Sequence, residues 1–370
     1  MADFLMPSLG ADMETGKVVQ WLVKPGDRVK SGDVVAVVET HKGAIDVEIF
    51  LDGVIDDLVA IGEELPVGAL LAHVRDAQEA TRPKVSPAAR RRAHALGIDP
   101  DRLHGTGPDG AVTLADVEGA APQPIPSQAP SPSPSPSPSP SPEPPHRGFD
   151  PALMRQAIGA AMSRSKREIP HYYLASTIDF GAAAAWIETW NRARPPEEWL
   201  LPAVLLLKAT AHALAEVPQL NGFYENGAFR QGPGMHIGWA VALRGGGLVA
   251  PAIHDVDRKT LPELMSALRE LVQRVRAGGL RSSELTDPTI TVTSLGDRGA
   301  ESVFGVIYPP QVAIIGFGRV IERPWVFEGR IVPRPVLGAS LAGDHRASDG
   351  HIGSLLLAAI DRALQAPEKL

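Results

Sequence analysis

The stretch that decides the fold of the N-terminal region is Val38-Glu39-Thr40-His41-Lys42-Gly43-Ala44-Ile45-Asp46. Apolar, mostly β-branched residues fill positions 34–38 before it, and apolar and charged residues alternate over 45–50 at its end. Two such runs joined by a short polar segment that ends in glycine are typical of a β-hairpin. Lys42 is therefore expected at the tip of a hairpin, where a lone lysine is most often an ordinary solvated side chain.

The pattern around this hairpin occurs twice, in residues 18–38 and 54–74, at a constant offset of 36 residues. Two similar sets of short strands predict two similar sheets packed face to face around an approximate two-fold axis. In such a β-sandwich the hairpin lies at one end and the chain termini at the other, so a group attached to Lys42 is free to travel. The matched pairs include Val18 with Val54, Leu22 with Leu58, Gly26 with Gly62 and Gly32 with Gly68.

Residues 1–76 resemble the lipoyl domains of 2-oxo acid dehydrogenase complexes. The resemblance implies that lipoic acid is attached covalently to Lys42. Biotin domains share the fold but flank their lysine with methionines, whereas His41 and Gly43 stand here, so a biotin carrier is the weaker alternative. The residues that carry the resemblance are Met6-Pro7-Ser8-Leu9-Gly10, Gly26-Asp27, Gly32-Asp33 and Glu39-Thr40-x-Lys42.

Length and composition limit the possible classes of protein. A chain of 370 residues predicts two or three domains. The net charge of −7 gives no support to nucleic-acid or anionic-membrane binding. We find no apolar run long enough to span a bilayer and no signal-like N-terminal segment. The absence of cysteine excludes disulfides and thiolate metal sites, fits a cytoplasmic protein, and means that any reacting thiol comes from a cofactor or substrate.

Residues 84–120 predict a small helical unit. Ser86-Pro87 provides a helix cap followed by proline at the first helical position. The glycines of 105–110 resemble a dinucleotide motif, but no strand precedes them and Pro108 interrupts them, so we reject that interpretation. The unit resembles the peripheral-subunit-binding domain of the same complexes. The resemblance implies that it holds the decarboxylating 2-oxo acid dehydrogenase or dihydrolipoyl dehydrogenase, with Arg90 and Arg91 as candidate contacts to acidic partners; the alternative is a solvated basic face.

Residues 121–147 form a Ser/Pro-rich linker. Proline at alternate positions prevents helix and sheet and favours an extended polyproline conformation. At roughly 3.1 Å per residue such a segment spans on the order of 80 Å. A tether of this kind can hold an attached group at an effective concentration of about millimolar, which suits a shuttling arm.

Residues 148–370 predict one mixed α/β domain. An opening helix carries Arg155, Ile158 and Met162 on one face, and residues 201–215 are apolar almost all round, as in a buried helix. Thr260 with Glu263 predicts a capping box before an amphipathic helix. Strands are predicted from 169, over 236–243 paired with 248–253, over 289–293, over 312–315 and over 335–341, and a helix is predicted after 350.

The chemical centre of this domain is predicted at Gly343-Asp344-His345-Arg346-Ala347-Ser348-Asp349-Gly350, between a strand and a helix. A lone His-x-x-x-Asp is weak evidence, since a structural histidine is commoner than a catalytic one. The whole stretch resembles the Asp-His-Arg-x-x-Asp-Gly signature of dihydrolipoyl acyltransferases, whose fold is that of chloramphenicol acetyltransferase. Further matching residues are Ile169-Pro170-His171, Gly247-Leu248-Val249-x-Pro251 and Thr293-Ser294-Leu295-Gly296.

The chemistry explains these residue types. A thiol ionises near pH 8.5, so transfer of an acyl group from dihydrolipoyl to coenzyme A needs a base, and an imidazole that ionises near pH 6.5 is suited to it. His345 is the candidate base. The resemblance implies a hydroxyl that stabilises the oxyanion, and counting back from His345 places it at Thr293, with Ser294 as the fallback on the opposite strand face. By resemblance Asp349 orients the loop, with Arg155 as a possible partner; the alternative is a helix-capping carboxylate. Arg346 and His351 are interpreted as structural.

The combined hypothesis is a multidomain acyltransferase that forms the core of a 2-oxo acid dehydrogenase complex. The resemblance implies homotrimers with active sites at subunit interfaces, built into a larger core. We expect no metal site, nucleic-acid partner or membrane partner. The alternatives are a non-catalytic lipoyl scaffold, a biotin carrier and a free O-acetyltransferase. The acyl group cannot be derived from the sequence.

Overall fold

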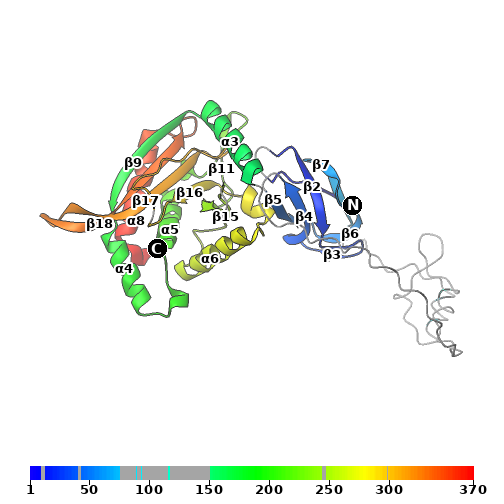
Figure 1. Cartoon of the computed structure of the whole chain (residues 1–370), viewed down its shortest axis with the longest axis horizontal. Coiled ribbons are helices and arrows are strands. Elements are labelled where there is room, and N and C mark those ends of the chain that lie inside the picture. Colours follow the sequence, from blue (N-terminus) through cyan, green and yellow to red (C-terminus); the bar gives the residue numbers. More distant parts are fainter. Residues whose placement is uncertain are drawn as a thin grey trace.

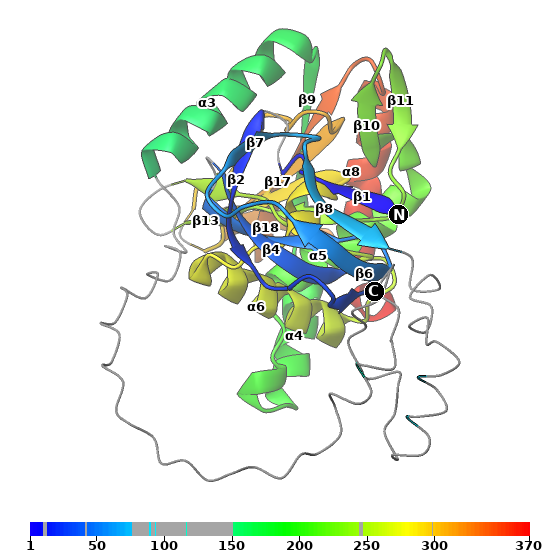
Figure 2. The same cartoon turned by 90° about the vertical axis from the view of Figure 1, so that its right-hand side faces the viewer.

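Two globular bodies account for most of the described chain, a β-sandwich at the N-terminus and a larger α/β domain at the C-terminus (Figure 1). Seen from the side of the sandwich, the α/β domain lies behind it (Figure 2). The predicted small unit at 84–120 and the linker at 121–147 lie almost wholly outside the described residues. The computed structural model describes residues 1–9, 13–40, 43–75, 89, 93, 116, 151–243, 247–297 and 299–370.

The sandwich has two four-stranded sheets, with strand orders β1-β8-β6-β3 and β5-β4-β2-β7. The predicted repeat is confirmed, because β3 and β7 each join the sheet of the other copy, as a two-fold relation requires. The matched glycines Gly26, Gly62, Gly32 and Gly68 all have φ between +84° and +96°, which a side chain would strain. The strands are β1 (Ala2–Leu5), β2 (Thr15–Trp21), β3 (Arg28–Val29), β4 (Asp33–Thr40), β5 (Gly43–Ile49), β6 (Gly53–Leu58), β7 (Glu64–Pro66) and β8 (Leu70–Arg75).

The C-terminal domain is built on a six-stranded mixed sheet of order β15-β12-β16-β17-β18-β9. Strand β16 is parallel to β12 and β17, whereas β18 is antiparallel to β17 and β9. Its strands are β9 (His171–Asp179), β12 (Ile237–Trp239), β15 (Ala252–Ile253), β16 (Ile290–Ser294), β17 (Ala313–Phe327) and β18 (Arg330–Asp344). Outside this sheet lie the pairs β10 (Gly222–Glu225) with β11 (Ala228–Gln231) and β13 (Val241–Ala242) with β14 (Leu248–Val249).

Helices pack against one face of this sheet and enclose the large core, to which α5, α6 and α8 all contribute buried apolar residues. The capping box predicted at Thr260 and Glu263 is present at the start of α6. The helices are α3 (Pro151–Glu168), α4 (Gly181–Arg192), α5 (Pro202–Glu216), α6 (Leu261–Ala277), α7 (Ser282–Thr286) and α8 (Gly350–Gln365), with short 3-10 turns at Pro196–Glu198, Pro218–Leu220 and Pro367–Lys369.

The opposite face of the sheet is covered by the segment that links β16 to β17. Glycines on β17 allow this close approach: a Cβ at Gly316 would lie 2.5 Å from the Val303 carbonyl oxygen, and one at Gly318 would meet Glu301. Beyond this point β17 and β18 continue as a hairpin that projects from the body of the domain (Figure 1), with Val326 70% exposed.

One expectation about this domain is wrong. The segment Pro196–Glu216 is long and apolar enough, by length and composition alone, to cross a membrane, although no apolar run of that length was expected. The explanation is the buried position of α5 within it. Nine of its side chains lie in the protein core, which requires the same composition as a bilayer span.

Candidate active site

His345 lies in the turn between β18, which ends at Asp344, and α8, which begins at Gly350. The predicted strand-to-helix junction is therefore present. The His345 backbone N–H donates a hydrogen bond to the Pro170 carbonyl at 3.0 Å, which ties the turn to the start of β9. The side chain is exposed at the rim of the domain. An imidazole in this position is accessible to a substrate.

An ion pair between a buried aspartate and a partly exposed arginine holds this turn in shape. The Asp344 side chain is 0% exposed and accepts hydrogen bonds from Arg346 Nε at 3.0 Å and from Arg346 Nη2 at 2.7 Å. The carboxylate also accepts from the Arg346 backbone N–H at 2.9 Å. These bonds raise the pKa of Arg346 above its usual value. The guanidinium also stacks 4.1 Å over the ring of Tyr224. The structural role expected for Arg346 follows directly from these contacts.

Tyr172 is a neighbour of His345 to which we assigned no role from its sequence. Its ring stands edge-on to the imidazole, with 5.5 Å between centroids, and its hydroxyl is 2.9 Å from Ser348 Oγ. Burial raises the pKa of Tyr172. A Cβ at Gly343 would lie 2.4 Å from Tyr172 Cζ, so glycine is needed at this position. The only available signal was alternation along β9, which cannot show which residue faces the imidazole.

His171 is a structural histidine on the strand next to this turn. Its Nε2 accepts a hydrogen bond from the Ile307 N–H at 3.1 Å, so its Nδ1 donates to the Ile169 carbonyl at 2.8 Å. Burial lowers the pKa of His171, which keeps the ring neutral. The residue thereby anchors the segment that covers the sheet, and both of its nitrogens are occupied.

Asp349 caps the helix that follows. Its Oδ1 accepts a hydrogen bond from the Ile352 N–H at 3.0 Å, at the N-terminus of α8. The Ile352 bond is the main cause of a lowered Asp349 pKa, with smaller contributions from His351 and His345. No ion pair joins Asp349 to Arg155, both of which belong to the described residues. Asp349 therefore has the geometry of the capping alternative, which still fixes the end of the His345 turn.

Thr293 lies at the other end of the sheet. It pairs with Gly316 on β17, which in turn pairs with Ser340 on β18. His345 follows Ser340 by five residues, which is roughly 16 Å along the strands, and two strand spacings add about 10 Å across them. One chain therefore does not bring the Thr293 hydroxyl to the His345 imidazole.

Ser294 points to the opposite face from Thr293, as strand alternation predicts. It lies on the same face of β16 as Ile290 and Val292, whose side chains belong to the helix-covered core. The Ser294 hydroxyl accepts a hydrogen bond of 3.4 Å from the Gly296 N–H. Both Thr293 and Ser294 are half-buried.

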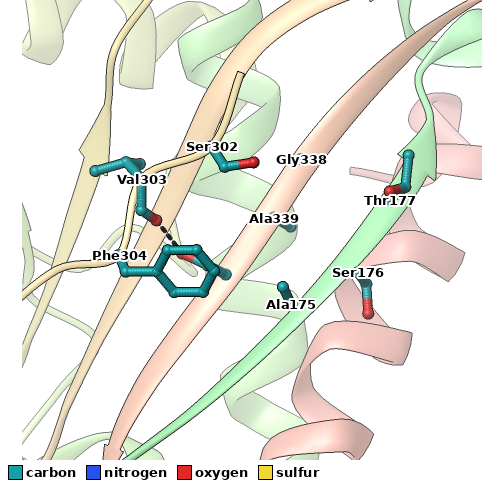
Figure 3. A pocket seen from close by; sticks show the side chains of 9 residues that line it. Ala175, Ser176, Thr177, Ser302, Val303, Phe304, Gly338 and Ala339 are labelled. Carbon is teal, nitrogen blue, oxygen red and sulfur yellow. Dashed lines mark hydrogen bonds between the residues drawn. The ribbon is translucent and has the colours of Figure 1, made fainter. Parts of the chain in front are cut away.

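A small cavity of about 110 Å³ lies beside β18 and β9, under Ser302, Val303 and Phe304 (Figure 3). The Ser340 hydroxyl in its wall donates to the Val303 carbonyl. Ser340, in the cavity wall, lies in the same row of paired residues across the sheet as Thr293. The cavity is therefore distant from His345. Because its lining contains no ionisable side chain, it cannot supply an acid or a base.

Three predicted functional residues, Lys42, Arg90 and Arg91, lie outside the described residues. The strands that flank Lys42 are described: β4 and β5 pair as far as Thr40 opposite Gly43, where φ is +104°. The end of a paired hairpin can present a lysine without displacing the core, because the packed residues lie further along both strands. The described strands thus fit a covalently attached arm.

Three family models match the chain: 2-oxoacid dehydrogenases acyltransferase (catalytic domain) over 149–370, Biotin-requiring enzyme over 2–74, and e3 binding domain over 83–118. A Bacillus subtilis dihydrolipoyllysine-residue acetyltransferase component of the acetoin cleaving system is 30% identical, over 99% of this chain and 98% of the relative. The corresponding component of the Zymomonas mobilis pyruvate dehydrogenase complex is 27% identical, over 98% and 97%.

Two solved structures are similar to the C-terminal domain. A probable dihydrolipoamide acetyltransferase from Listeria monocytogenes is 30% identical, with a TM-score of 0.53 over 57% of this chain and 91% of its own. The Azotobacter vinelandii dihydrolipoamide acetyltransferase, in which a serine, a histidine and an asparagine were investigated for their catalytic role, is 27% identical, with a TM-score of 0.55 over 58% and 90%.

These findings confirm the predicted fold class, the acyltransferase activity and lipoic acid as the cofactor. A binding module for dihydrolipoyl dehydrogenase is also confirmed, together with participation in a multienzyme complex. The chain belongs to the 2-oxoacid dehydrogenase acyltransferase family, and as the core component of a 2-oxo acid dehydrogenase complex it transfers an acyl group from a lipoyl arm to coenzyme A.

Proposed function

We propose that this chain is an acetyltransferase whose active site is shared between two copies, with His345 from one copy and Thr293 from the other. The observation that carries the proposal is the separation of these residues at opposite ends of one sheet. A hydroxyl that stabilises an oxyanion has to lie about 3 Å from it, so a distance well above 10 Å within one chain leaves both residues without the other half of a site. A homotrimer, in which each interface joins unlike ends of neighbouring copies, would complete three equivalent sites.

Spacing along the chain supports the assignment of these residues. In the Azotobacter vinelandii enzyme the investigated serine precedes the histidine by 52 residues, and the asparagine follows it by four. The same spacings from His345 reach Thr293 and Asp349. Thr293 retains the hydroxyl of a serine, and Asp349 retains an oxygen acceptor where an asparagine has one. Ser294 does not fit the spacing.

The residues of this chain then have distinct roles. The lipoyl group supplies a long arm that carries the acyl group as a thioester. The exposed His345 imidazole accepts the proton of the coenzyme A thiol as that sulfur attacks, and it returns a proton to the departing sulfur. The Thr293 hydroxyl donates a hydrogen bond to the acyl oxygen as negative charge develops there. The Asp344–Arg346 pair and the Asp349 cap hold the turn in the required shape.

Acetyl is the acyl group that the relatives favour. The Bacillus subtilis and Zymomonas mobilis relatives are both acetyltransferase components, of an acetoin cleaving system and a pyruvate dehydrogenase complex. We expect kcat/KM for acetyl-coenzyme A with free dihydrolipoamide to exceed that for succinyl- and isobutyryl-coenzyme A by at least about tenfold. A preference for either larger acyl group would contradict this choice.

The assembly and the cell compartment extend the same proposal. The core of a pyruvate dehydrogenase multienzyme complex is cubic in a solved structure that is 27% identical over 58% of this chain. We propose that trimers of this chain build a larger core in the cytoplasm, with Arg90 and Arg91 as contacts to the docked dehydrogenases. Light scattering of the purified chain gives the subunit number, and a stable monomer would contradict it.

Two variants test the proposed arm and base separately. Lys42→Ala is expected to abolish turnover of the assembled complex while transfer to free dihydrolipoamide continues. His345→Ala is expected to lose both activities, because the base is needed whichever thiol reacts. Mass spectrometry of the wild-type chain from lipoate-fed cells should show lipoylation at Lys42; biotin at that position, or an unmodified lysine, would overturn the arm.

The alternative is a lipoyl scaffold whose C-terminal domain only assembles. The observation that favours it is Thr293, where the methyl group of threonine could redirect the hydroxyl. It predicts that His345→Ala changes neither assay, whereas the catalytic proposal predicts a loss in both.

A further inference from the structure

The sandwich and the α/β domain are in direct contact through strand β5. This strand forms the edge of its sheet, next to β4, and it lies on the side of the sandwich that faces the α/β domain (Figure 1). The facing element is the segment 279–285, which follows the C-terminus of α6 and includes most of α7. We call this segment the seat.

Backbone pairing joins β5 to the seat. The Asp46 N–H donates to the Leu280 carbonyl at 3.0 Å, and Asp46 forms a parallel bridge with Arg281. The Glu48 N–H donates to Ser282 Oγ at 3.1 Å. An edge strand presents a row of unpaired backbone groups, and the seat satisfies two of them on β5, one with a backbone carbonyl as an added strand would and one with a serine hydroxyl.

The Glu48 side chain is enclosed by the seat. Only 6% of it is exposed, although alternation along β5 places Glu48 on the face opposite the apolar residues Ile45, Val47 and Ile49. Glu48 Oε2 accepts hydrogen bonds from the Ser283 N–H at 3.1 Å and from Ser282 Oγ at 3.4 Å, and Arg281 Nη1 lies 3.9 Å from Oε1. A carboxylate is buried at low cost only when it is paired in this way, so the contact is specific for an acidic residue at position 48.

Hydrogen bonds within the α/β domain fix the backbone of the seat, and the seat also makes an apolar contact. Glu284, also buried, accepts hydrogen bonds from the Arg281 N–H at 3.0 Å and from Arg274 Nε at 3.1 Å, which fixes the backbone that Glu48 meets. Leu285 packs against the cores of both domains. A braced polar socket beside a shared leucine resembles an interface more than a chance contact between surfaces.

We propose that segment 279–285 is a docking seat for the lipoyl domain of the same chain, with Glu48 as the residue that engages it. The occupant is identified by the contacts themselves, since the sandwich residues that bond to the seat, Asp46 and Glu48, both belong to β5. The meaning of the seat rests on the proposed function. An arm that visits separate enzymes needs a domain that leaves, so the seat is a resting position that covers the β5 edge between visits.

The absence of cysteine makes a direct test possible. Asp46→Cys combined with Arg281→Cys creates the only thiol pair in the chain. Paired strands lie about 4.8 Å apart, which is within the Cα separation that a disulfide allows. Mild oxidation of the assembled protein should give a disulfide within single chains, seen as unchanged mass on a non-reducing gel and as a crosslinked peptide by mass spectrometry.

The matched control places one thiol on the other sheet. Asp57→Cys with Arg281→Cys uses an exposed aspartate of β6, and it should form less than about a tenth of the disulfide under the same conditions. Equal crosslinking in both pairs, or no disulfide in the first pair, would overturn the seat. Disulfides only between chains would overturn its occupation by the same chain.

A second measurement follows the Glu48 contact without cysteines. Glu48→Ala should speed hydrogen exchange of the Ser283 amide by at least about tenfold, because that N–H loses a charged acceptor. Glu48→Gln keeps an oxygen acceptor and should have a smaller effect. The control, Glu63→Ala in an exposed turn, should change nothing at Ser283. Unchanged exchange in Glu48→Ala would contradict the seat, whereas acyl transfer to free dihydrolipoamide tests the proposed function independently of both measurements.

Discussion

The two ends of the six-stranded sheet differ in how they hold their functional side chain. At one end, the turn that carries His345 is fixed by the pair of Arg346 with the buried Asp344 and by the contact of Tyr172 with Ser348. At the other end, Thr293 is followed by the exposed Leu295 and Asp297. One end presents the His345 imidazole on a turn that is already fixed, and the other presents the Thr293 hydroxyl next to exposed residues. This difference is what the proposed sharing of the site between two copies requires.

The largest loss of activity is expected from substitution of His345. His345→Ala should lower kcat for transfer between acetyl-coenzyme A and dihydrolipoamide by about 10²–10⁴-fold, because the attacking thiol loses its base. Stability should change by less than about 0.5 kcal/mol, since the side chain is exposed. His351→Ala is the matched control, an exposed histidine on the next helix that should keep wild-type activity. Equal losses in both variants would contradict a special role for His345.

The second-largest loss of activity is expected from substitution of Thr293. Thr293→Val keeps a β-branched side chain of similar shape but removes the hydroxyl, and kcat should fall by about 10²–10³-fold. Thr293→Ser should stay close to wild type because the donor is retained. Ser294→Ala is the control, since this side chain lies on the opposite strand face. A loss in Ser294→Ala with full activity in Thr293→Val would reverse the assignment.

The free energy of unfolding tests whether the Asp344–Arg346 pair fixes the His345 turn. Arg346→Ala leaves the fully buried Asp344 carboxylate without its partner and should cost about 3 kcal/mol of unfolding free energy. The control is Arg362→Ala, which breaks an exposed ion pair with Glu216 and should cost less than about 1 kcal/mol. Urea denaturation of both variants makes the comparison, and similar losses would show that the turn is not specially braced.

The smallest effect is expected for the helix cap. Asp349→Asn keeps an oxygen that accepts from Ile352, so activity should remain within about threefold of wild type. The hydrogen bond from Ile352 lowers the pKa of Asp349 in the folded protein. The stabilisation is therefore complete above the unfolded pKa, near 3.9, and is lost as pH falls through the lower folded pKa. Thermal melting of Asp349→Asn should be less sensitive to acid than that of the wild type; identical curves would contradict this.

Most of the fold could be predicted because its signals are local. The repeat at an offset of 36 residues defined the two sheets, and the Thr260–Glu263 box defined the start of α6. The length of the β17–β18 hairpin could not be predicted, because most of it projects without a buried face to create an alternating pattern. The pair β10–β11 was likewise missed, since its residues alternate weakly between buried and exposed.

The candidate site was predictable only in part. The stretch around His345 was identified from its residue types, and the parity of β16 placed Thr293 and Ser294 on opposite faces. The separation of Thr293 from His345 depends on the order of strands in the sheet, which sequence patterns do not give. The burial of Glu48 was missed for a similar reason, because alternation describes one domain and cannot show that another domain covers it.

Mixing two defective chains tests the shared site most directly. His345→Ala and Thr293→Val, co-expressed in equal amounts, form mixed oligomers in which about a quarter of the interfaces pair an intact His345 with an intact Thr293. If the site is shared, dihydrolipoamide acetylation should recover to about a quarter of the wild-type rate. Activity no higher than the average of the two separate variants would contradict it, because a site within one chain cannot be restored by a second chain.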